Sequence, residues 1–555
     1  MRIRRVPGGV APPAWIRPVR INPGRSDQMR PNGAEPNCND FIYQKTAQGT
    51  MPIFKKAIAV VTALLVFLSA GAPIADALSV REERELADEF LRAVYDYYDV
   101  IDDPVINEHI NRIGSKLTSQ IPPQHFGIRF HVIREDTFNA FAGPGGNIFI
   151  FSGLIEALET ENELAAIIAH EIAHVTLRHV QDMVERSKRT SFASMAGLVA
   201  GILVGLGGAP AAGTALSMGS MAAGQTMMLS YSRENELQAD FFGLKYLSDA
   251  GYHEYGMLSA LRTIRSREWF GENEVPTYLR THPGAAERMS ILGTKISEKD
   301  PEIVNTYEYD RMRMRTIALY GRQSGMLERL ERHTRNRPEN PSAHYGYGLA
   351  LAKGGNPEKG VSQLEKAVSL KPDDPVIAVA LGQAHFLAGN NDKALAVLRD
   401  IEGIWRYGTD GIFTLGRIQM DKEDHAEAIR SFEKLLEHYP GHQQSLFFLG
   451  QSLGRIGELG EAHFTLGQYH RMQGSLETAS FHFDRALSET RDPEKQEEIR
   501  QRIRDLDASI KRQRRQEREA ERESQSWLIE AGKFHGESPP PLGGRSKGCC
   551  VSEHF

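Results

Sequence analysis

The stretch from His170 to His174 reads HEIAH, and the stretch from Ser232 to Asp240 reads SRENELQAD. On a helix, residues four positions apart lie one turn apart on the same face, so His170 and His174 can bind one metal ion together. Glu171 stands beside the first histidine and can act as a general base toward a metal-activated water. The alternative is an ordinary amphipathic helix whose two histidines have conventional hydrogen-bond partners.

The second stretch contains an ExxxD pattern that can complete such a site. Glu236 can supply a third protein ligand, and Asp240 lies one helical turn further along. A third histidine in the HExxHxxGxxH pattern is absent, because Leu177 and Val180 stand where glycine and histidine are required. Three protein ligands with an open fourth position are typical of catalytic zinc, whereas structural zinc usually has four. The sequence therefore predicts one Zn²⁺ per chain, bound by the two histidines and Glu236.

Taken together, the two motifs resemble metallopeptidase family 48, a gluzincin family. The likeness extends upstream to NAFA at 139–142 and PGG at 144–146, and downstream to THP at 281–283 with Arg288. In that family the two histidines and the glutamate of ExxxD bind zinc, and the glutamate of HExxH is the base. The resemblance thus implies that Glu171 is the base and that Asp240 is a supporting or proton-donating residue. A carboxylate beside a metal-binding histidine typically orients it, and we expect this role for Asp240.

His282 precedes Pro283, and a residue before proline is held away from helical geometry, so the sequence predicts a loop here. The family likeness favours a place in the active site. There His282 would either stabilise the transition state or occupy the fourth zinc position in a resting state. A surface histidine without a role is the alternative.

Alternating and helical patterns before the HExxH stretch predict a small α+β unit. Two helical patterns fall within residues 80–120, and three short strands are expected at 128–133, 139–142 and 147–152, with a turn at 143–146. The strand at 139–142 is either an edge that pairs with extended substrate or simply a core strand. The uncharged, glycine-rich stretch 190–231 is interpreted as a helical hairpin, either over the active site and touching a membrane surface or a partner, or buried in the core.

The C-terminal half contains a 34-residue repeat. Gly348, Gly382, Gly416 and Gly450 recur at this period, which is that of tetratricopeptide helix pairs. Such arrays bind extended peptides or partner proteins along a groove. The expected fold is therefore a mostly helical zinc metallopeptidase domain with a small β-sheet (78–325), followed by an all-α tetratricopeptide-repeat solenoid (338–490).

Flanking segments have their own signatures. Residues 1–50 show no periodicity and are interpreted as a misassigned extension. A stretch with two lysines, an apolar run and a small-residue site predicts a signal peptide at 51–77, cleaved after Ala77; an uncleaved membrane anchor is the alternative. Residues 491–530 are expected to form a charged helix and 531–555 a disordered tail. The cysteines, at 38, 549 and 550, leave the folded region without a disulfide, which suits export to the periplasm.

The chain has 41% hydrophobic and 25% charged residues and a net charge of −6, which argues against nucleic-acid binding. Family members with such repeats are periplasmic and act in outer-membrane protein assembly. The resemblance implies a periplasmic zinc endopeptidase that degrades stalled outer-membrane protein clients and contacts the assembly machinery through its repeats. The alternative is a chaperone or scaffold with latent protease activity.

Overall fold

The computed structural model describes residues 79–190, 199, 231–268, 277–296 and 306–534. The expected extension, the signal peptide, the three cysteines and the segment 535–555 lie outside these residues. So does the stretch 190–231, apart from Thr190, Val199 and Tyr231. Two compact units divide the chain, Met1–Asp76 and Ala77–Phe555, and every described residue belongs to the second.

Two helices precede the sheet, as the periodicity predicted. Helix α2 (Val80–Tyr97) begins with a capping box, in which the side chains of Ser79 and Glu82 satisfy each other's backbone amides. Helix α3 (Pro104–Thr118) begins at Asp103, whose Oδ1 accepts hydrogen bonds from the amides of residues 105 and 106.

A three-stranded sheet follows, in the order β1-β3-β2. Strand β1 (Arg129–Ile133) runs parallel to β3 (Asn147–Phe151), and β2 (Ala140–Ala142) runs antiparallel to β3 on its other side. The 3₁₀ turn η1 (Pro144–Gly146) joins β2 to β3. The three expected strands and the turn are confirmed, and β2 proves to be both an edge strand and fully buried.

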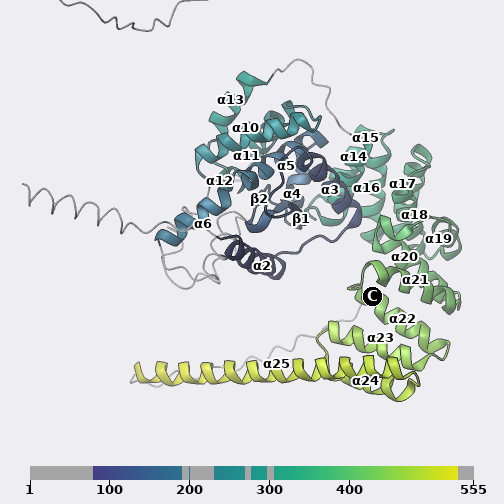
Figure 1. The fold of residues 1–555 in the computed structure, drawn as a ribbon. Helices are drawn as coiled ribbons and strands as arrows, with labels where there is room; N and C mark the ends of the chain where they lie inside the picture. Colours follow the sequence, from purple (N-terminus) through teal and green to yellow (C-terminus); the bar gives the residue numbers. More distant parts are fainter. Residues whose placement is uncertain (1–78, 191–198, 200–230, 269–276, 297–305, 535–555) are drawn as a thin grey trace, which may run out of the picture. The chain divides into compact units, whose positions relative to one another are not determined.

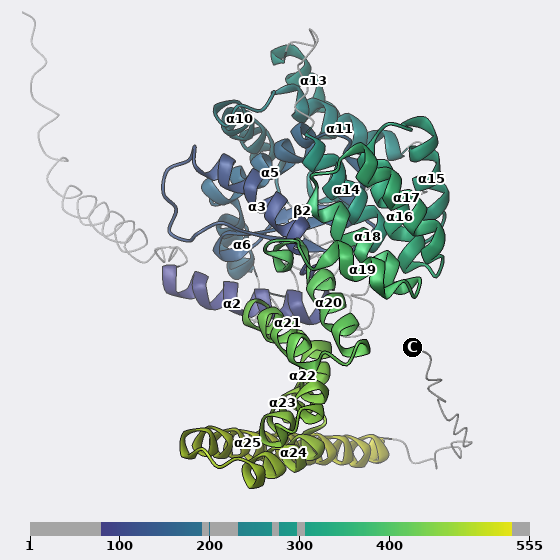
Figure 2. The ribbon, with the colours of Figure 1, turned by 90° about the vertical axis from the view of Figure 1, so that its right-hand side faces the viewer.

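The HExxH sequence lies in the middle of helix α5 (Glu161–Thr176), every residue of which is buried from Glu161 to His174. Helix α10 (Arg233–Asp249) packs against α5 (Figures 1 and 2). Gly243 allows this close approach, because a Cβ there would lie 3.2 Å from the backbone of His170. The remaining helices of this domain are α4 (Ser152–Ala157), α6 (His179–Thr190), α11 (Tyr255–Glu268), α12 (Thr277–Thr281) and α13 (Ala285–Lys295).

The repeat region consists of short helices packed on their neighbours. Each repeat glycine lies where two helices touch. A Cβ on Gly348, Gly382, Gly416 or Gly450 would come within 2.5–2.7 Å of the side chain sixteen residues later. A side chain at any of these positions would force the neighbouring helix to shift, so the same preference for glycine recurs once in each 34-residue repeat. The helices are α15 (Met326–Asn336), α16 (Pro341–Lys353), α17 (Pro357–Leu370), α18 (Pro375–Leu387), α19 (Asn391–Leu398), η2 (Ile404–Tyr407), α20 (Thr409–Asp421), α21 (His425–His438), α22 (Gln443–Arg455), α23 (Leu459–Met472) and α24 (Leu476–Glu489).

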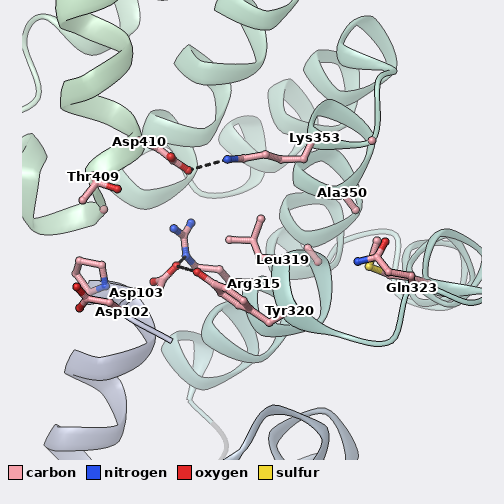
Figure 3. A pocket seen from close by; sticks show the side chains of 15 residues that line it. Asp102, Asp103, Arg315, Leu319, Tyr320, Gln323, Ala350, Lys353, Thr409 and Asp410 are labelled. Carbon is pink, nitrogen blue, oxygen red and sulfur yellow. Dashed lines mark hydrogen bonds and ion pairs between the residues drawn. The ribbon is translucent and has the colours of Figure 1, made fainter. Parts of the chain in front are cut away.

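Helix α14 (Tyr307–Tyr320) lies between the domain that contains α5 and the repeats, and its buried Arg315 contacts both. Arg315 donates from Nε to Asp103 Oδ2 at 2.7 Å and from Nη1 to the hydroxyl of Tyr345 on α16 at 2.9 Å. Figure 3 shows the cavity beside this arginine, about 390 Å³ in volume, where Lys353 also donates to Asp410 at 3.0 Å. The ion pairs Arg315–Asp103 and Lys353–Asp410 therefore contribute to the walls of this cavity.

Helix α25 (Pro493–Phe534) ends the described chain and contains the expected charged segment. It continues to Phe534, past the boundary expected at 530. Among the described residues, no helix combines the length and the apolar composition that a membrane span requires.

Candidate metal centre

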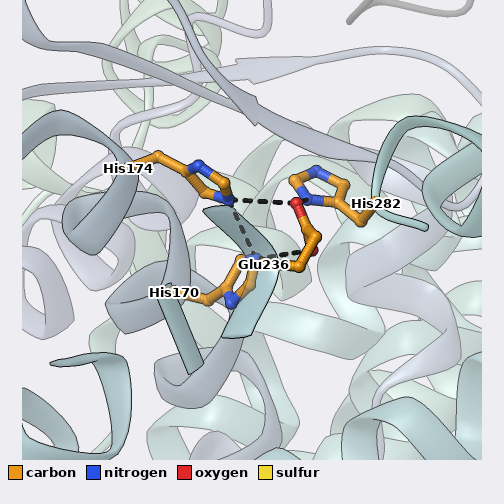
Figure 4. A group of neighbouring side chains, drawn as sticks. All are labelled: His170, His174, Glu236 and His282. Carbon is orange, nitrogen blue, oxygen red and sulfur yellow. Dashed lines mark hydrogen bonds and ion pairs between the residues drawn. The ribbon is translucent and has the colours of Figure 1, made fainter. Parts of the chain in front are cut away.

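Three side chains from two helices converge in the core (Figure 4). The Nε2 atoms of His170 and His174 lie 3.1 Å apart. Glu236, on α10, places Oε2 at 3.4 Å from His170 Nε2 and Oε1 at 3.4 Å from His174 Nε2. All three side chains are essentially inaccessible to solvent. The ligand set expected from the sequence is thus brought together by the packing of α10 on α5.

These distances suit a zinc ion. Bonds of about 2.0–2.1 Å in a tetrahedral shell place neighbouring donor atoms roughly 3.3 Å apart. With His282 included, the four donor groups lie within 4.8 Å of one another, the one such group among the described residues. Burying two imidazoles around a carboxylate is costly without a shared partner. Two nitrogens and a carboxylate oxygen are the donors that catalytic zinc prefers.

Glu171 lies beside these donors with its carboxylate unsatisfied. Both of its side-chain oxygens are buried and accept no hydrogen bond from the described residues, although His282 Nε2 lies 3.5 Å from Oε1. Burial raises the pKa of Glu171 above its ordinary value. A buried carboxylate without a donor is expensive, and it marks a position where a reacting group can bind.

Asp240 contacts a histidine of the cluster. Its Oδ1 lies 3.0 Å from His170 Nδ1, the ring nitrogen that faces away from the other donors. This is the arrangement in which a carboxylate fixes the orientation of a metal-binding imidazole. Although burial opposes ionisation, the Arg288 guanidinium and His170 hold the pKa of Asp240 below its ordinary value.

His282 is fully buried, so the surface alternative is wrong. It follows the short helix α12, as the residue before Pro283. Its Nδ1 lies 3.1 Å from Glu236 Oε1, and its Nε2 lies 3.2 Å from the carbonyl oxygen of Ala140. The imidazole therefore stands between the candidate ligands and strand β2.

Four further residues line the site; the sequence assigned none of them a function, although Arg288 was part of the family likeness. Arg288, on α13, donates hydrogen bonds to both Asp240 and Glu236. Although burial opposes ionisation, His282 and Arg288 hold the pKa of Glu236 well below its ordinary range. His179 Nδ1 lies 3.0 Å from His174 Nδ1.

Two tyrosine rings complete the surroundings of the histidines. Tyr231 stacks on His174 with ring centroids 3.8 Å apart, and Tyr278 stacks on His282 at 4.3 Å. Weak signals existed in the sequence: Tyr231 directly precedes the cap of α10, and Tyr278 stands one turn before His282. Neither position belongs to the motifs.

Comparisons with known proteins identify the domains. Residues 104–295 match the model of peptidase family M48. Tetratricopeptide-repeat models match residues 327–375, 355–408 and 413–463, so the repeats begin ahead of the boundary expected at 338. Helix α15, which starts at Met326, accounts for the difference because it packs against α16.

Several curated relatives share one name. The beta-barrel assembly-enhancing protease of Yersinia pestis is 26% identical over 70% of this chain and 80% of its own length. The Escherichia coli (strain K12) protein of the same name is 27% identical over 54% of this chain and 62% of its own. The putative one of Vibrio cholerae is 32% identical over 45% and 51%. The chain spans less than two thirds of the latter two relatives.

Proposed function

We propose that this chain, a metalloprotease whose peptidase family M48 domain is followed by tetratricopeptide repeats, is a zinc-dependent endopeptidase that removes misassembled or stalled proteins of the bacterial envelope. The observation that carries this proposal is the unsatisfied carboxylate of Glu171 next to three converging donor groups. A scaffold alone has no use for a buried carboxylate that accepts no hydrogen bond.

The proposed ligands are His170, His174 and Glu236. A zinc ion there supplies Lewis acidity, which polarises the scissile carbonyl and makes a water molecule acidic at neutral pH. Glu171 takes the proton of the attacking water at its carboxylate and passes it to the leaving amine. Its buried setting, which raises its pKa, suits a group that must both accept and release a proton.

The neighbouring residues hold these groups in place. Asp240 keeps the Nδ1 side of His170 oriented, and Arg288 donates hydrogen bonds to both Asp240 and Glu236, which offsets part of their negative charge. His282 is proposed to occupy the fourth position in the resting enzyme, because its Nδ1 already contacts Glu236. Leaving that position would admit substrate.

The relatives' names point to outer-membrane assembly, and we extend that role to this chain as part of the proposal. Residues 51–77 are proposed as the signal peptide of a periplasmic protein. The repeats are proposed to bind the assembly machinery, because tetratricopeptide arrays bind proteins and perform no chemistry of their own. N-terminal sequencing of the mature protein tests export: the first residue is expected to be Leu78, and a start at residue 1 or 51 would refute cleavage.

The central experiment combines metal analysis with proteolysis. Purified protein is expected to contain one zinc per chain and to cleave casein. Glu171→Gln is expected to retain the zinc and to lose activity by roughly 10²-fold or more, because it cannot accept the proton. Glu234→Gln, an exposed glutamate on α10, is the matched control. Cleavage by Glu171→Gln at the wild-type rate would exclude Glu171 as the base.

A further inference from the structure

Strand β2 has an outer edge that faces the candidate metal centre. In an antiparallel strand, successive carbonyls point alternately to the two neighbours. The carbonyl of Asn139 accepts from the amide of Phe151 on β3, so it points inward. The carbonyls of residues 138, 140 and 142 therefore point away from β3, toward the side where His282 lies.

Each of these three outward carbonyls accepts a hydrogen bond. Phe138 O accepts from the backbone amide of Tyr278 at 2.9 Å. Ala140 O accepts from His282 Nε2 at 3.2 Å, and Ala142 O accepts from the hydroxyl of Tyr231, also at 3.2 Å. The first donor is a backbone amide, whereas the other two are side chains, which a change of rotamer would take away from the carbonyls. Ala140 O and Ala142 O are thus the two outward acceptors whose present donors are not part of the backbone.

Tyr231 is held in this position by the histidines. It is 2% exposed, and its ring is nearly parallel to that of His174, with an interplanar angle of 26°. The ring of His282 lies 5.3 Å away. A tyrosine hydroxyl is protonated at neutral pH, so it can donate the hydrogen bond to Ala142 O. One side chain therefore touches a proposed zinc ligand and closes the strand edge.

We propose that Tyr231 is a positioning residue that closes the outer edge of β2, and that an extended polypeptide displaces its hydroxyl when it binds. Backbone amides of that polypeptide would donate to Ala142 O and Ala140 O in place of Tyr231 and His282. This inference rests on the proposed function, since it concerns how the same site takes up substrate. The recognised ligand is an extended segment of any sequence, because backbone pairing needs no particular side chain.

Closure by Tyr231 weakens substrate binding without assisting the chemistry. Substrate must exchange the Tyr231–Ala142 hydrogen bond for one of its own, which subtracts a neutral hydrogen bond from the binding energy. Tyr231→Phe keeps the ring on His174 but removes the donor. We expect a roughly five-fold fall in KM for casein, about 1 kcal/mol, with kcat changed by less than about two-fold.

Tyr309→Phe is the matched control. Its hydroxyl is likewise buried and donates to a backbone carbonyl, Leu158 O at 3.0 Å, outside the metal centre. Both variants lose one buried hydrogen bond of the same kind, and both are expected to lower the melting temperature. Only Tyr231→Phe is expected to change KM. Equal KM values in the two variants would show that Tyr231 is only a structural residue and would overturn the proposal. A lower kcat at unchanged KM would also overturn it, and would indicate that Tyr231 stabilises the transition state.

A binding measurement separates this inference from the proposed function. Fluorescence anisotropy of a labelled, unstructured casein peptide is measured on Glu171→Gln protein, with and without Tyr231→Phe. The dissociation constant is expected to fall roughly five-fold with Tyr231→Phe. If the peptide binds in this way but wild-type protein never cleaves, the protease proposal fails and the edge closure stands. Unchanged or weaker peptide binding would overturn the proposal that Tyr231 closes the strand edge, whatever the proteolytic activity. If Tyr231→Phe loses zinc, Tyr231→Met, which also lacks the hydroxyl, replaces it in this measurement.

Discussion

Arg288 binds Asp240 through two parallel hydrogen bonds, from Nε to Oδ2 and from Nη2 to Oδ1, each 2.7 Å long. The same guanidinium donates from Nη1 to Glu236 Oε2 at 2.6 Å. Both carboxylates are buried and contact His170. One guanidinium therefore binds both Glu236, a proposed zinc ligand, and Asp240, the carboxylate that contacts the proposed ligand His170.

The first prediction follows from this geometry. A lysine at position 288 is a point charge and cannot bridge two carboxylates as a planar guanidinium does. Arg288→Lys is expected to weaken zinc affinity by about 10–100-fold, the usual effect of removing a group that orients metal ligands. Competition with a chelating dye measures it. Arg280→Lys, an exposed arginine on α12, is the control, and equal affinity in both variants would contradict the role of Arg288.

The second prediction concerns His282. Replacing it with alanine removes the imidazole from both Glu236 Oε1 and Ala140 O. His282→Ala is expected to retain zinc and to raise the rate of casein cleavage, because the fourth position and the strand edge are both opened. His125→Ala, an exposed histidine, is the control. A lower rate would favour transition-state stabilisation by His282, and an unchanged rate would exclude both roles.

The third prediction is a pH dependence of stability that originates outside the metal centre. Although Glu161 Oε2 lies 3.6 Å from its Nε2, burial and the Arg112 and Arg311 guanidiniums lower the pKa of His109 to about 3. In the unfolded chain a histidine binds a proton near pH 6.5. Between about pH 6.5 and 3 the unfolded state therefore binds more protons, and the free energy of unfolding falls as pH falls.

His109→Gln removes this contribution. For each protein, the fall in melting temperature from pH 7 to pH 5 is measured. This fall is expected to be smaller for His109→Gln than for the wild type. The difference is bounded by about 1.4 kcal/mol per pH unit. Differential scanning calorimetry of zinc-loaded protein measures it, with His125→Gln as the control. Parallel curves for wild type and His109→Gln would show that His109 is not responsible.

The fourth prediction separates the repeats from the chemistry. Deleting the whole array would remove Tyr345, which hydrogen-bonds Arg315, so a terminal truncation is the cleaner change. Ending the chain after Gln473 removes α24 and α25, which supply all but one of the buried residues of the last hydrophobic cluster; the remaining one is Phe464 on α23. Repeat arrays tolerate such shortening because each repeat contacts only its neighbours.

Cleavage of a short peptide by this truncated chain is expected to stay within about two-fold of the full chain. Its co-purification with outer-membrane assembly proteins is expected to fall. Undiminished recovery of those proteins would remove the terminal helices from the proposed docking surface, and a loss of peptide cleavage would show that the repeats support the active site directly.

Features that depend on local spacing could be predicted from the sequence. His170 and His174 share a helix face because four residues make about one turn. The repeat glycines recur because each helix pair makes the same close contact within one 34-residue unit. The short strands before α5 followed from alternation and flanking turn residues. In each case the interacting residues lie within one element or one repeat.

Tertiary structure decided how the residues outside the two metal-binding motifs contact the metal centre and the strand edge. Arg288 meets His170 across 118 positions, and His282 meets the Ala140 carbonyl across 142. Tyr231 reaches the Ala142 carbonyl from 89 positions away. No periodicity links such positions; they meet because α10, α12 and α13 pack around α5 and the edge of β2. The motifs could identify the donor atoms, whereas the residues that balance their charge and close the strand edge are set by how buried surfaces pack.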